Sequence, residues 1–250
     1  MSGSSVTSAK PRPDRELLTA SLLLFLTRGS GYGYGLGLQL REQALDVEMT
    51  VAYRVLRALE RDRQVSSRWI GSSVGPRRRL YSLTAKGRRA LDALVPAVIE
   101  SRDRYCDFAE VCQRTLPRLR KGPPPDTAAA RRPDQELLTG WVLLLLSGDA
   151  SYGYDLRRQL AEHKVEADPS KVYRVLRRLD ADGSVRSRWS DPVAGPRRRV
   201  YEVTTAGRDR LDAIVELIWR VCDTYEDFAQ AYDDVNDDHR GPEIPRRTPR

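Results

Sequence analysis

The chain repeats itself. Residues 13–110 align with residues 133–230 at a constant offset of 120 without a gap, and about 45 of the 98 aligned positions are identical. A period of this length indicates duplication of a whole domain, because solenoid repeats are only about 20 to 50 residues long. If one copy normally functions as half of a symmetric dimer, two fused copies build that dimer within one polypeptide. We therefore expect a function that needs two equivalent surfaces.

The charge of the chain favours a polyanionic partner. The 250 residues carry a formal net charge of +8, with a pI near 9.6, which suits nucleic acid or an acidic membrane surface. The most apolar runs, Leu22–Leu26 and Val142–Leu146, are far shorter than the roughly 18 to 20 residues of a bilayer span, so we expect buried helices and no membrane partner.

The sequence also predicts a cytoplasmic location. The first 13 residues lack the apolar core of a signal peptide. The three cysteines, Cys106, Cys112 and Cys222, are odd in number, and the other copy has Glu226, Tyr232 and Arg102 in their places. This pattern argues against a disulfide framework and for a reducing compartment.

Each copy begins with a pattern typical of three helices. In the first copy, Asp14 is placed to cap a helix running to about Thr27, and a second helix follows the glycines and tyrosines of residues 29–35. Thr50 is the predicted N-cap of the third helix. The second copy marks that start more clearly, because Asp168-Pro169-Ser170 is a strong helix-initiation signal.

The hydrophobic period then changes from about 3.6 to 2, which predicts a β-hairpin. Val65, Ser67 and Trp69 alternate with polar residues, a loop covers Gly71–Pro76, and Leu80–Leu83 return. Three helices followed by a two-stranded hairpin is the winged helix-turn-helix layout. The fold class expected is mainly α with small β-hairpins, as tandem winged helix-turn-helix domains.

A long fourth helix ends each copy, after a threonine cap at Thr84 or Thr204. Its apolar positions alternate in steps of four and three, the seam of helices that pack lengthwise, although closing its own domain is the simpler alternative. Pro96 is expected to bend or locally break the first of these helices. The seam comprises Leu91, Val95, Val98, Arg102, Tyr105, Ala109 and Cys112 in the first copy, and Leu211, Val215, Ile218, Cys222, Tyr225, Ala229 and Tyr232 in the second.

These patterns divide the chain into five segments. We expect winged-helix domains over residues 13–112 and 133–235, joined by a Pro-rich, charged linker over residues 113–132. Residues 1–12 and 236–250 are expected to be disordered tails.

Five motifs recur in the same order in both copies: YGYxL, YRVLRxL, SRW, GPRRRxY and LTxxG, the last with Val in place of Leu in the second copy. In this order the chain resembles the PadR family of winged-helix transcriptional regulators, over about 100 residues of each copy. The resemblance implies a cytoplasmic repressor that dimerises through its C-terminal helix and inserts its third helix into the major groove. Many members respond to a small hydrophobic or phenolic effector.

Two features depart from the family pattern. Typical members carry one such domain and form homodimers, so the tandem copies put ordinary homodimerisation in doubt. Arg63 stands where the second copy has Gly183 and the family usually has glycine, so the turn into the first hairpin is expected to be strained or differently shaped.

A helix-turn-helix presents the first residues of its third helix to the base edges. Val51 could touch a thymine methyl group, whereas Lys171 could donate to guanine or to a phosphate, so we expect an imperfect palindrome with half-site centres about 34 Å apart. Tyr53 and Tyr173 begin the apolar face and are either core residues or phosphate contacts. The expected DNA-reading residues are Thr50, Val51, Tyr53 and Arg54, with Ser170, Lys171, Tyr173 and Arg174.

An arginine triplet follows each Gly-Pro turn of the wing. Alternate strand residues face opposite ways, so at most two of each three can face DNA together. The third is expected to pair with a carboxylate or to pack over Trp69 or Trp189. The triplets are Arg77, Arg78 and Arg79, and Arg197, Arg198 and Arg199.

Other functions fit the sequence less well. Its two histidines, His163 and His239, have no catalytic or metal-ligand spacing around them, so we expect neither an enzyme nor a cofactor. A protein-interaction adaptor is the alternative, although it would not require two basic wings. Trp141 and Trp219 occur only in the second copy, near the helical seam, and are either core residues or contacts for an aromatic or hydrophobic effector. The expected assembly is an intramolecular pseudo-dimer, either a single chain in solution or a dimer of pseudo-dimers.

Overall fold

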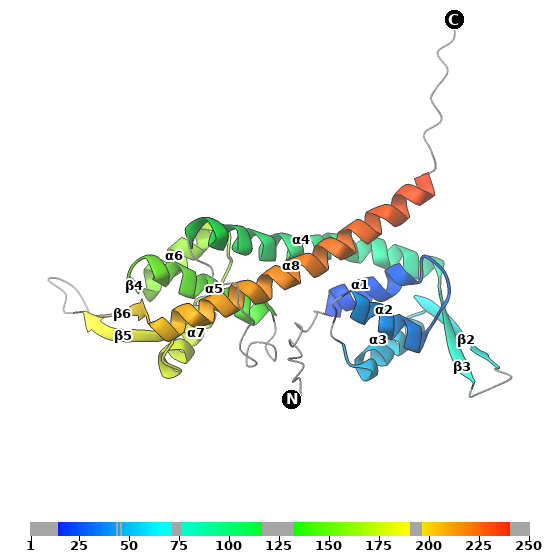
Figure 1. The fold of residues 1–250 in the computed structure, drawn as a ribbon, viewed down its shortest axis with the longest axis horizontal. Helices are drawn as coiled ribbons and strands as arrows, with labels where there is room; N and C mark the ends of the chain where they lie inside the picture. Colours follow the sequence, from blue (N-terminus) through cyan, green and yellow to red (C-terminus); the bar gives the residue numbers. More distant parts are fainter. Residues whose placement is uncertain are drawn as a thin grey trace, which may run out of the picture. The chain divides into compact units, whose positions relative to one another are not determined.

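The structure, a computed structural model, describes residues 15–43, 45, 47–71, 77–116, 133–190 and 197–240. It is mainly helical, and the two copies repeat one order of helices and strands, as predicted (Figure 1). The first copy contains α1 (Arg15–Phe25), β1 (Gly31–Tyr32), α2 (Gly33–Glu42), α3 (Met49–Arg61), β2 (Val65–Ile70), β3 (Arg78–Leu83) and α4 (Ala85–Thr115). The second contains α5 (Pro133–Gly148), β4 (Ser151–Tyr152), α6 (Gly153–Glu162), α7 (Pro169–Ala181), β5 (Val185–Ser190), β6 (Arg198–Val203) and α8 (Thr205–Arg240).

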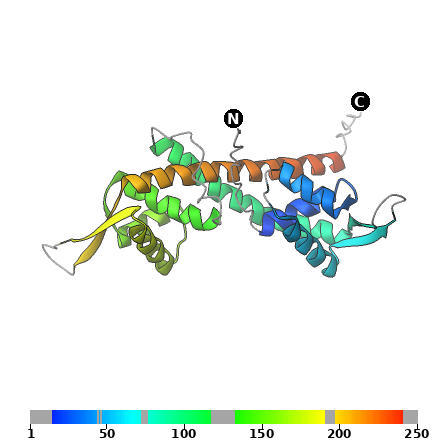
Figure 2. The ribbon, with the colours of Figure 1, turned by 60° about the horizontal axis from the view of Figure 1, so that its bottom comes forward.

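The small sheets have three strands, where the sequence predicted two. β1 pairs antiparallel with β3, in the order β1-β3-β2, and the second copy repeats this as β4-β6-β5. The segment predicted as a Gly-Tyr loop therefore contains a strand, whose two residues are too few to show an alternating pattern. In each copy the hairpin, hereafter the wing, projects from the helical body (Figure 2).

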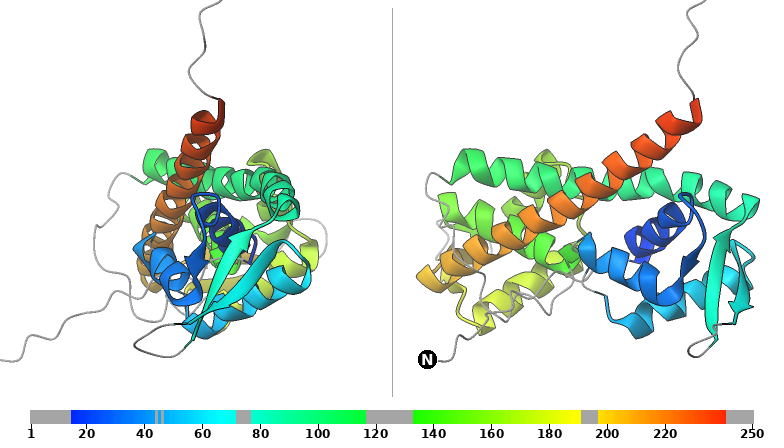
Figure 3. Two further views of the ribbon diagram at one scale, coloured as in Figure 1. Left: turned by 90° about the vertical axis from the view of Figure 1, so that its right-hand side faces the viewer. Right: turned by 45° about the vertical axis from the view of Figure 1, so that its right-hand side comes forward.

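The first helix of each copy forms the centre of its core. Leu17, Leu22 and Leu23 of α1 are fully buried, and so are Val142 and Leu143 of α5. α3 and α7 each bury one face, through Ala52, Leu56 and Leu59 or their counterparts Val172, Leu176 and Leu179, and leave the other face to solvent. Figure 3 shows α1, α2 and α3 beside the wing of the first copy.

The two third helices start differently. α7 begins as predicted, with the Asp168 side chain accepting a hydrogen bond of 2.7 Å from the backbone N–H of Ser170. The predicted cap at Thr50 is wrong. α3 begins two residues earlier than that cap implies, at Met49, and its N-cap is Glu48, which makes no capping bond through its side chain. Thr50 is thus already helical.

The turn into the first wing has the conformation expected to be strained. Arg63 has φ +57° and Gly183, its counterpart, has φ +75°. Both lie in the left-handed region, which costs an ordinary residue about 1 kcal/mol and glycine almost nothing.

The last helix of each copy starts at the predicted threonine. The Thr84 hydroxyl oxygen accepts from the N–H of Gly87 at 3.0 Å, and the Thr204 oxygen accepts from Gly207 at 3.2 Å. α4 continues through Pro96, so the predicted local break does not occur. α8 extends to Arg240, into the segment predicted as a tail, whereas the tail before residue 15 and most of the linker lie outside the described residues.

The seam positions of both helices are mostly buried. Leu91, Val98 and Tyr105 in α4 are at most 2% exposed, and Leu211, Ile218 and Tyr225 in α8 are at most 3% exposed. The seam positions are therefore mostly buried, as either predicted packing of the long helices requires.

The chain divides into two compact units that do not coincide with the two sequence copies. The α1 unit joins the first copy, up to Asp103, with the end of α8 from Cys222 onward. The α5 unit comprises Arg104–Val221, and so joins the end of α4 with the second winged helix. Each unit therefore contains the end of the other copy's long helix. Among the helices that the structure describes, none combines the length and the apolar character that crossing a bilayer requires.

Candidate DNA-binding site

The first two turns of each third helix present most of the predicted residues to solvent. Thr50 and Arg54 are exposed and Val51 is half-buried in α3. Ser170, Lys171 and Arg174 are all exposed in α7. Because the opposite face of each helix is in the core, these side chains are the ones a base edge could meet.

Two hydroxyl groups in these turns already have partners. The Ser170 hydroxyl donates to Asp168 at 2.5 Å, and this bond, with that from the Ser170 backbone, lowers the pKa of Asp168. Thr50 donates more weakly to Glu48, at 3.4 Å. The cations Lys171 and Arg174 therefore supply most of the outward chemistry of α7, and Val51 and Arg54 that of α3.

Tyr53 and Tyr173 pack against the second helix of their own copy. A Cβ atom added at Gly33 would lie 2.5 Å from Cε1 of Tyr53, and one at Gly153 would lie 2.6 Å from Cε1 of Tyr173. The glycine of each YGY motif is thus needed to seat the tyrosine ring. Tyr53 is half-buried and Tyr173 is 38% exposed, so a phosphate contact through either hydroxyl stays a prediction.

One arginine of the first triplet is held inside the wing. Arg79 donates from Nε to the Ser67 hydroxyl and from Nη2 to Glu60, both at 2.7 Å. Its guanidinium carbon also lies 5.9 Å from the Trp69 ring centroid. Arg77 and Arg78 are exposed. The expectation that the third arginine pairs with a carboxylate or packs over Trp69 is confirmed.

The second wing repeats the arrangement. Arg199 donates from Nε to Ser187 at 2.9 Å and from Nη2 to Asp180 at 2.7 Å, while Arg197 and Arg198 are exposed. Glu60 and Asp180 lie near the ends of α3 and α7. Each inner arginine therefore ties the wing to the third helix of its own copy.

Four exposed aromatic residues in these motifs were not predicted as site residues. Trp69 and Trp189 are 63% and 62% exposed on the wings, opposite Arg79 and Arg199 in the strand register. Tyr34 and Tyr154, 61% and 67% exposed, lie in the first turn of α2 and α6. Their exact repetition in the two copies was the signal that could have identified them.

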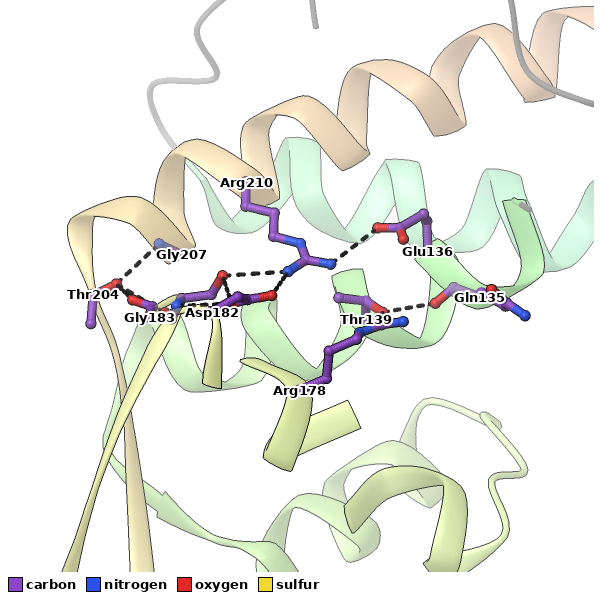
Figure 4. Close-up of polar contacts among 10 residues, drawn as sticks. Gln135, Glu136, Thr139, Arg178, Asp182, Gly183, Thr204, Gly207 and Arg210 are labelled. Atoms are coloured by element: carbon purple, nitrogen blue, oxygen red, sulfur yellow. Dashed lines mark hydrogen bonds and ion pairs between the residues drawn. The ribbon is translucent and has the colours of Figure 1, made fainter. Parts of the chain in front are cut away.

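A polar network around Arg210 connects α5, α7 and α8 in the second winged helix (Figure 4). Arg210 of α8 donates to Asp182, at the end of α7, and lies 3.9 Å from the buried carboxylate of Glu136 in α5. Burial acts to raise the pKa of Asp182, but hydrogen bonds from Ser184 and the Arg210 charge outweigh it, so the pKa is lowered. The first copy has Ala90 at the position of Arg210.

The two tryptophans predicted as effector contacts have different surroundings. Trp141 is 2% exposed, its ring centroid lying 5.2 Å from that of Phe108 and 4.8 Å from that of His163. Trp219 is 37% exposed on α8. Trp141 is thus enclosed by aromatic neighbours, and only Trp219 is open to solvent.

Several solved structures are similar to parts of the chain. A PadR-like regulator from Bacillus cereus is 24% identical over 32% of this chain and 80% of its own, with a TM-score of 0.30. A PadR family regulator from Eggerthella lenta is 29% identical over 43% of this chain and 88% of its own, with a TM-score of 0.29. Bacillus subtilis PadR in complex with operator DNA is 16% identical over 66% of this chain and 92% of its own, with a TM-score of 0.30.

A family model decides the assignment. No curated protein matches the chain. The model of the transcriptional regulator PadR-like family matches residues 22–93 and 142–213, together more than half of the chain and one match in each copy. The family consists of transcriptional regulators, which agrees with the prediction of a non-enzymatic protein. The chain belongs to the PadR-like family of transcriptional regulators and carries two PadR-like domains in tandem.

Proposed function

We propose that this regulator binds double-stranded operator DNA as an intramolecular pseudo-dimer and represses transcription by occluding the promoter. Each copy supplies one third helix to the major groove and one wing to the flanking backbone. The protein acts in the cytoplasm, the compartment that holds the DNA of a bacterial cell. It needs no metal or organic cofactor.

The observation that carries the proposal is the repetition of one exposed surface. In both copies, at least two predicted DNA-reading residues of the third helix and two arginines of the wing are exposed to solvent. An adaptor that binds only protein would not need this pair of basic surfaces. The positive charge of the whole chain also favours DNA as the partner.

Pairing within one chain is supported by the composition of the compact units. Each unit combines the winged helix of one copy with the end of the other copy's long helix. The family resemblance implies dimerisation through this helix. A single polypeptide therefore has both partners of such a pair.

The two copies should read different half-sites. Val51 offers an apolar contact suited to a thymine methyl group, whereas Lys171 at the same repeat position is a hydrogen-bond donor suited to guanine or phosphate. The operator is accordingly an imperfect palindrome, with half-site centres one helical turn, about 34 Å, apart. Exchanging the residues, as Val51→Lys with Lys171→Val, should exchange the preferred half-sites in a footprint.

An aromatic or hydrophobic effector is a second part of the proposal. Trp219 is the tryptophan on which such a ligand could act directly, because Trp141 is enclosed by Phe108 and His163. A compound library that quenches fluorescence of the Trp141→Phe variant but not of the Trp219→Phe variant would support contact at Trp219. A library without effect on either variant would contradict it.

Selection of fragmented genomic DNA on the purified protein, followed by sequencing, tests DNA recognition. The control protein carries Ala in place of Arg77, Arg78, Arg197 and Arg198. We expect a two-part motif that the wild type recovers and the control loses. Recovery of only unspecific, salt-sensitive DNA would contradict sequence-specific regulation and favour the adaptor.

A further inference from the structure

The end of each long helix inserts a phenylalanine into the core that holds the other copy's first helix. Phe108 of α4 belongs to the same compact unit as α5, and Phe228 of α8 belongs to the same unit as α1. Both rings are at most 1% exposed. The two phenylalanines occupy the same position in the repeat, but their surroundings differ.

In the α5 unit the aromatic neighbour of the phenylalanine comes from the receiving helix. Trp141 of α5 lies edge-on to Phe108, at 5.2 Å between ring centroids. Gly140 makes room for this pose, because a Cβ atom there would lie 2.6 Å from Cζ of Phe108. One turn beyond Phe108, the inserted helix has only Cys112, which is fully buried.

In the α1 unit the aromatic neighbour comes from the inserted helix itself. Tyr232, one turn beyond Phe228, stacks on it with 6.4 Å between centroids and 13° between the planes. The Tyr232 hydroxyl donates to Asp92 of α4 at 3.0 Å. At the positions of Gly140 and Trp141 the receiving helix has small residues, Ala20 and Ser21, both fully buried, and the Ser21 hydroxyl has no hydrogen-bond partner among the described residues.

The repeat relates these positions in pairs. Ser21 corresponds to Trp141, and Cys112 corresponds to Tyr232. Each unit therefore combines one large and one small residue: Trp141 with Cys112, and Ser21 with Tyr232. The large residue comes from the receiving helix in one unit and from the inserted helix in the other.

Pairing two identical copies from different chains would break this match. Two first copies would place Cys112 where the α1 unit has Tyr232, and so leave that unit without a large side chain at either position. Two second copies would place Tyr232 where the α5 unit has Cys112, and so add a large aromatic side chain to a unit that already contains Trp141.

We propose that Ser21, Cys112, Trp141 and Tyr232 form a steric code that makes each copy select the other copy of the chain as its partner and reject a second copy of itself. This inference rests on the intramolecular pairing proposed above and is independent of DNA binding. It identifies the residues that determine partner choice in a tandem protein whose two halves are otherwise so similar.

The test exchanges the two residues of the inserted helices. The Cys112→Tyr, Tyr232→Cys variant of the full chain has an unchanged amino-acid composition. In this variant the end of each long helix matches the first helix of its own copy instead of that of the other copy. We expect the wild type to sediment as a single chain of 28.4 kDa and this variant to form a species of twice that mass, with a lower Tm for any remaining single chain. Adding Ser21→Trp and Trp141→Ser restores the match between copies, and should restore the single-chain mass and raise the Tm toward that of the wild type.

Each outcome is decisive. An exchange variant with the mass and Tm of the wild type would overturn the code. If that variant does not fold, the fourfold variant decides: a folded single chain supports the code, and a fourfold variant that is unfolded or no more stable contradicts it. A wild type that is itself a two-chain species would instead overturn the intramolecular pairing of the proposed function.

Discussion

The three arginines of each wing differ in what they can contribute to DNA binding. Strand alternation predicted that one of them turns away from the exposed face, because this depends only on spacing along the chain. Its carboxylate partner could not be predicted, since Glu60 and Arg79 come together only when the wing folds back on α3. The same holds for Asp180 and Arg199.

We expect Ala in place of Arg77 and Arg78 to flatten the salt dependence of binding. Removing one arginine–phosphate interaction should reduce the slope of log K against log salt by about 0.9, because fewer counterions are released. Arg79→Ala should change this slope less and lower the Tm more, because Arg79 is paired with Glu60. Fluorescence anisotropy titrations at four salt concentrations give the slopes. An equal decrease in slope for both variants would contradict the assignment.

The left-handed turn at residue 63 provides a prediction on stability. Arg63→Gly should stabilise the fold by up to about 1 kcal/mol, since glycine adopts this conformation without steric cost. The matched change in the second copy, Gly183→Arg, should destabilise it by a similar amount. Urea unfolding measures both, and a destabilising Arg63→Gly would show that the turn is not strained.

The thiol of Cys112 should be unreactive in the folded protein. Burial raises the pKa of its thiol to about 12, so the reactive thiolate is scarce at pH 8. In a variant with Ser at positions 106 and 222, we expect Ellman's reagent to react at least about a thousandfold faster after unfolding than before it. A rapid reaction of the native variant would show that Cys112 is accessible.

Helices and strands whose apolar pattern extends over many residues were predicted from the sequence. Features that depend on only a few residues were not. The wings, the third helices and the seam of the long helices follow from alternation or heptads that extend over many residues. β1 has two residues and forms only because β3 lies beside it. Thr50 resembled a cap, but Glu48 is the residue with the extended backbone that an N-cap requires.

The Arg210 network gives the second winged helix a pH dependence of its own. Arg210→Ala would leave the buried Glu136 without this cation, and should destabilise the fold by about 3 kcal/mol at pH 7. Because the pKa of Asp182 is lowered on folding, its contribution is present at neutral pH and lost as the pH falls through the folded-state pKa. The difference between wild type and variant should therefore shrink in acid. Urea unfolding at pH 7 and pH 3 tests this, with Arg208→Ala as the control, and an equal difference at both pH values would contradict it.

For the whole molecule, the repeat predicted two matched domains and a long pairing helix, but not which helix end enters which core. That choice depends on the fit of side chains far apart in the sequence, such as Phe108 with Gly140 and Tyr232 with Asp92. The proposed consequence for function is that one polypeptide carries both DNA-reading surfaces of an operator.

The number of chains bound to one operator tests this claim most directly. A fluorescent duplex with the two-part motif, at a concentration far above Kd, is titrated with protein. The mass of the complex is measured by native mass spectrometry. We expect saturation at one chain per duplex, with both half-sites protected in a footprint of that complex. Saturation at two chains per duplex, or protection of only one half-site, would contradict the account.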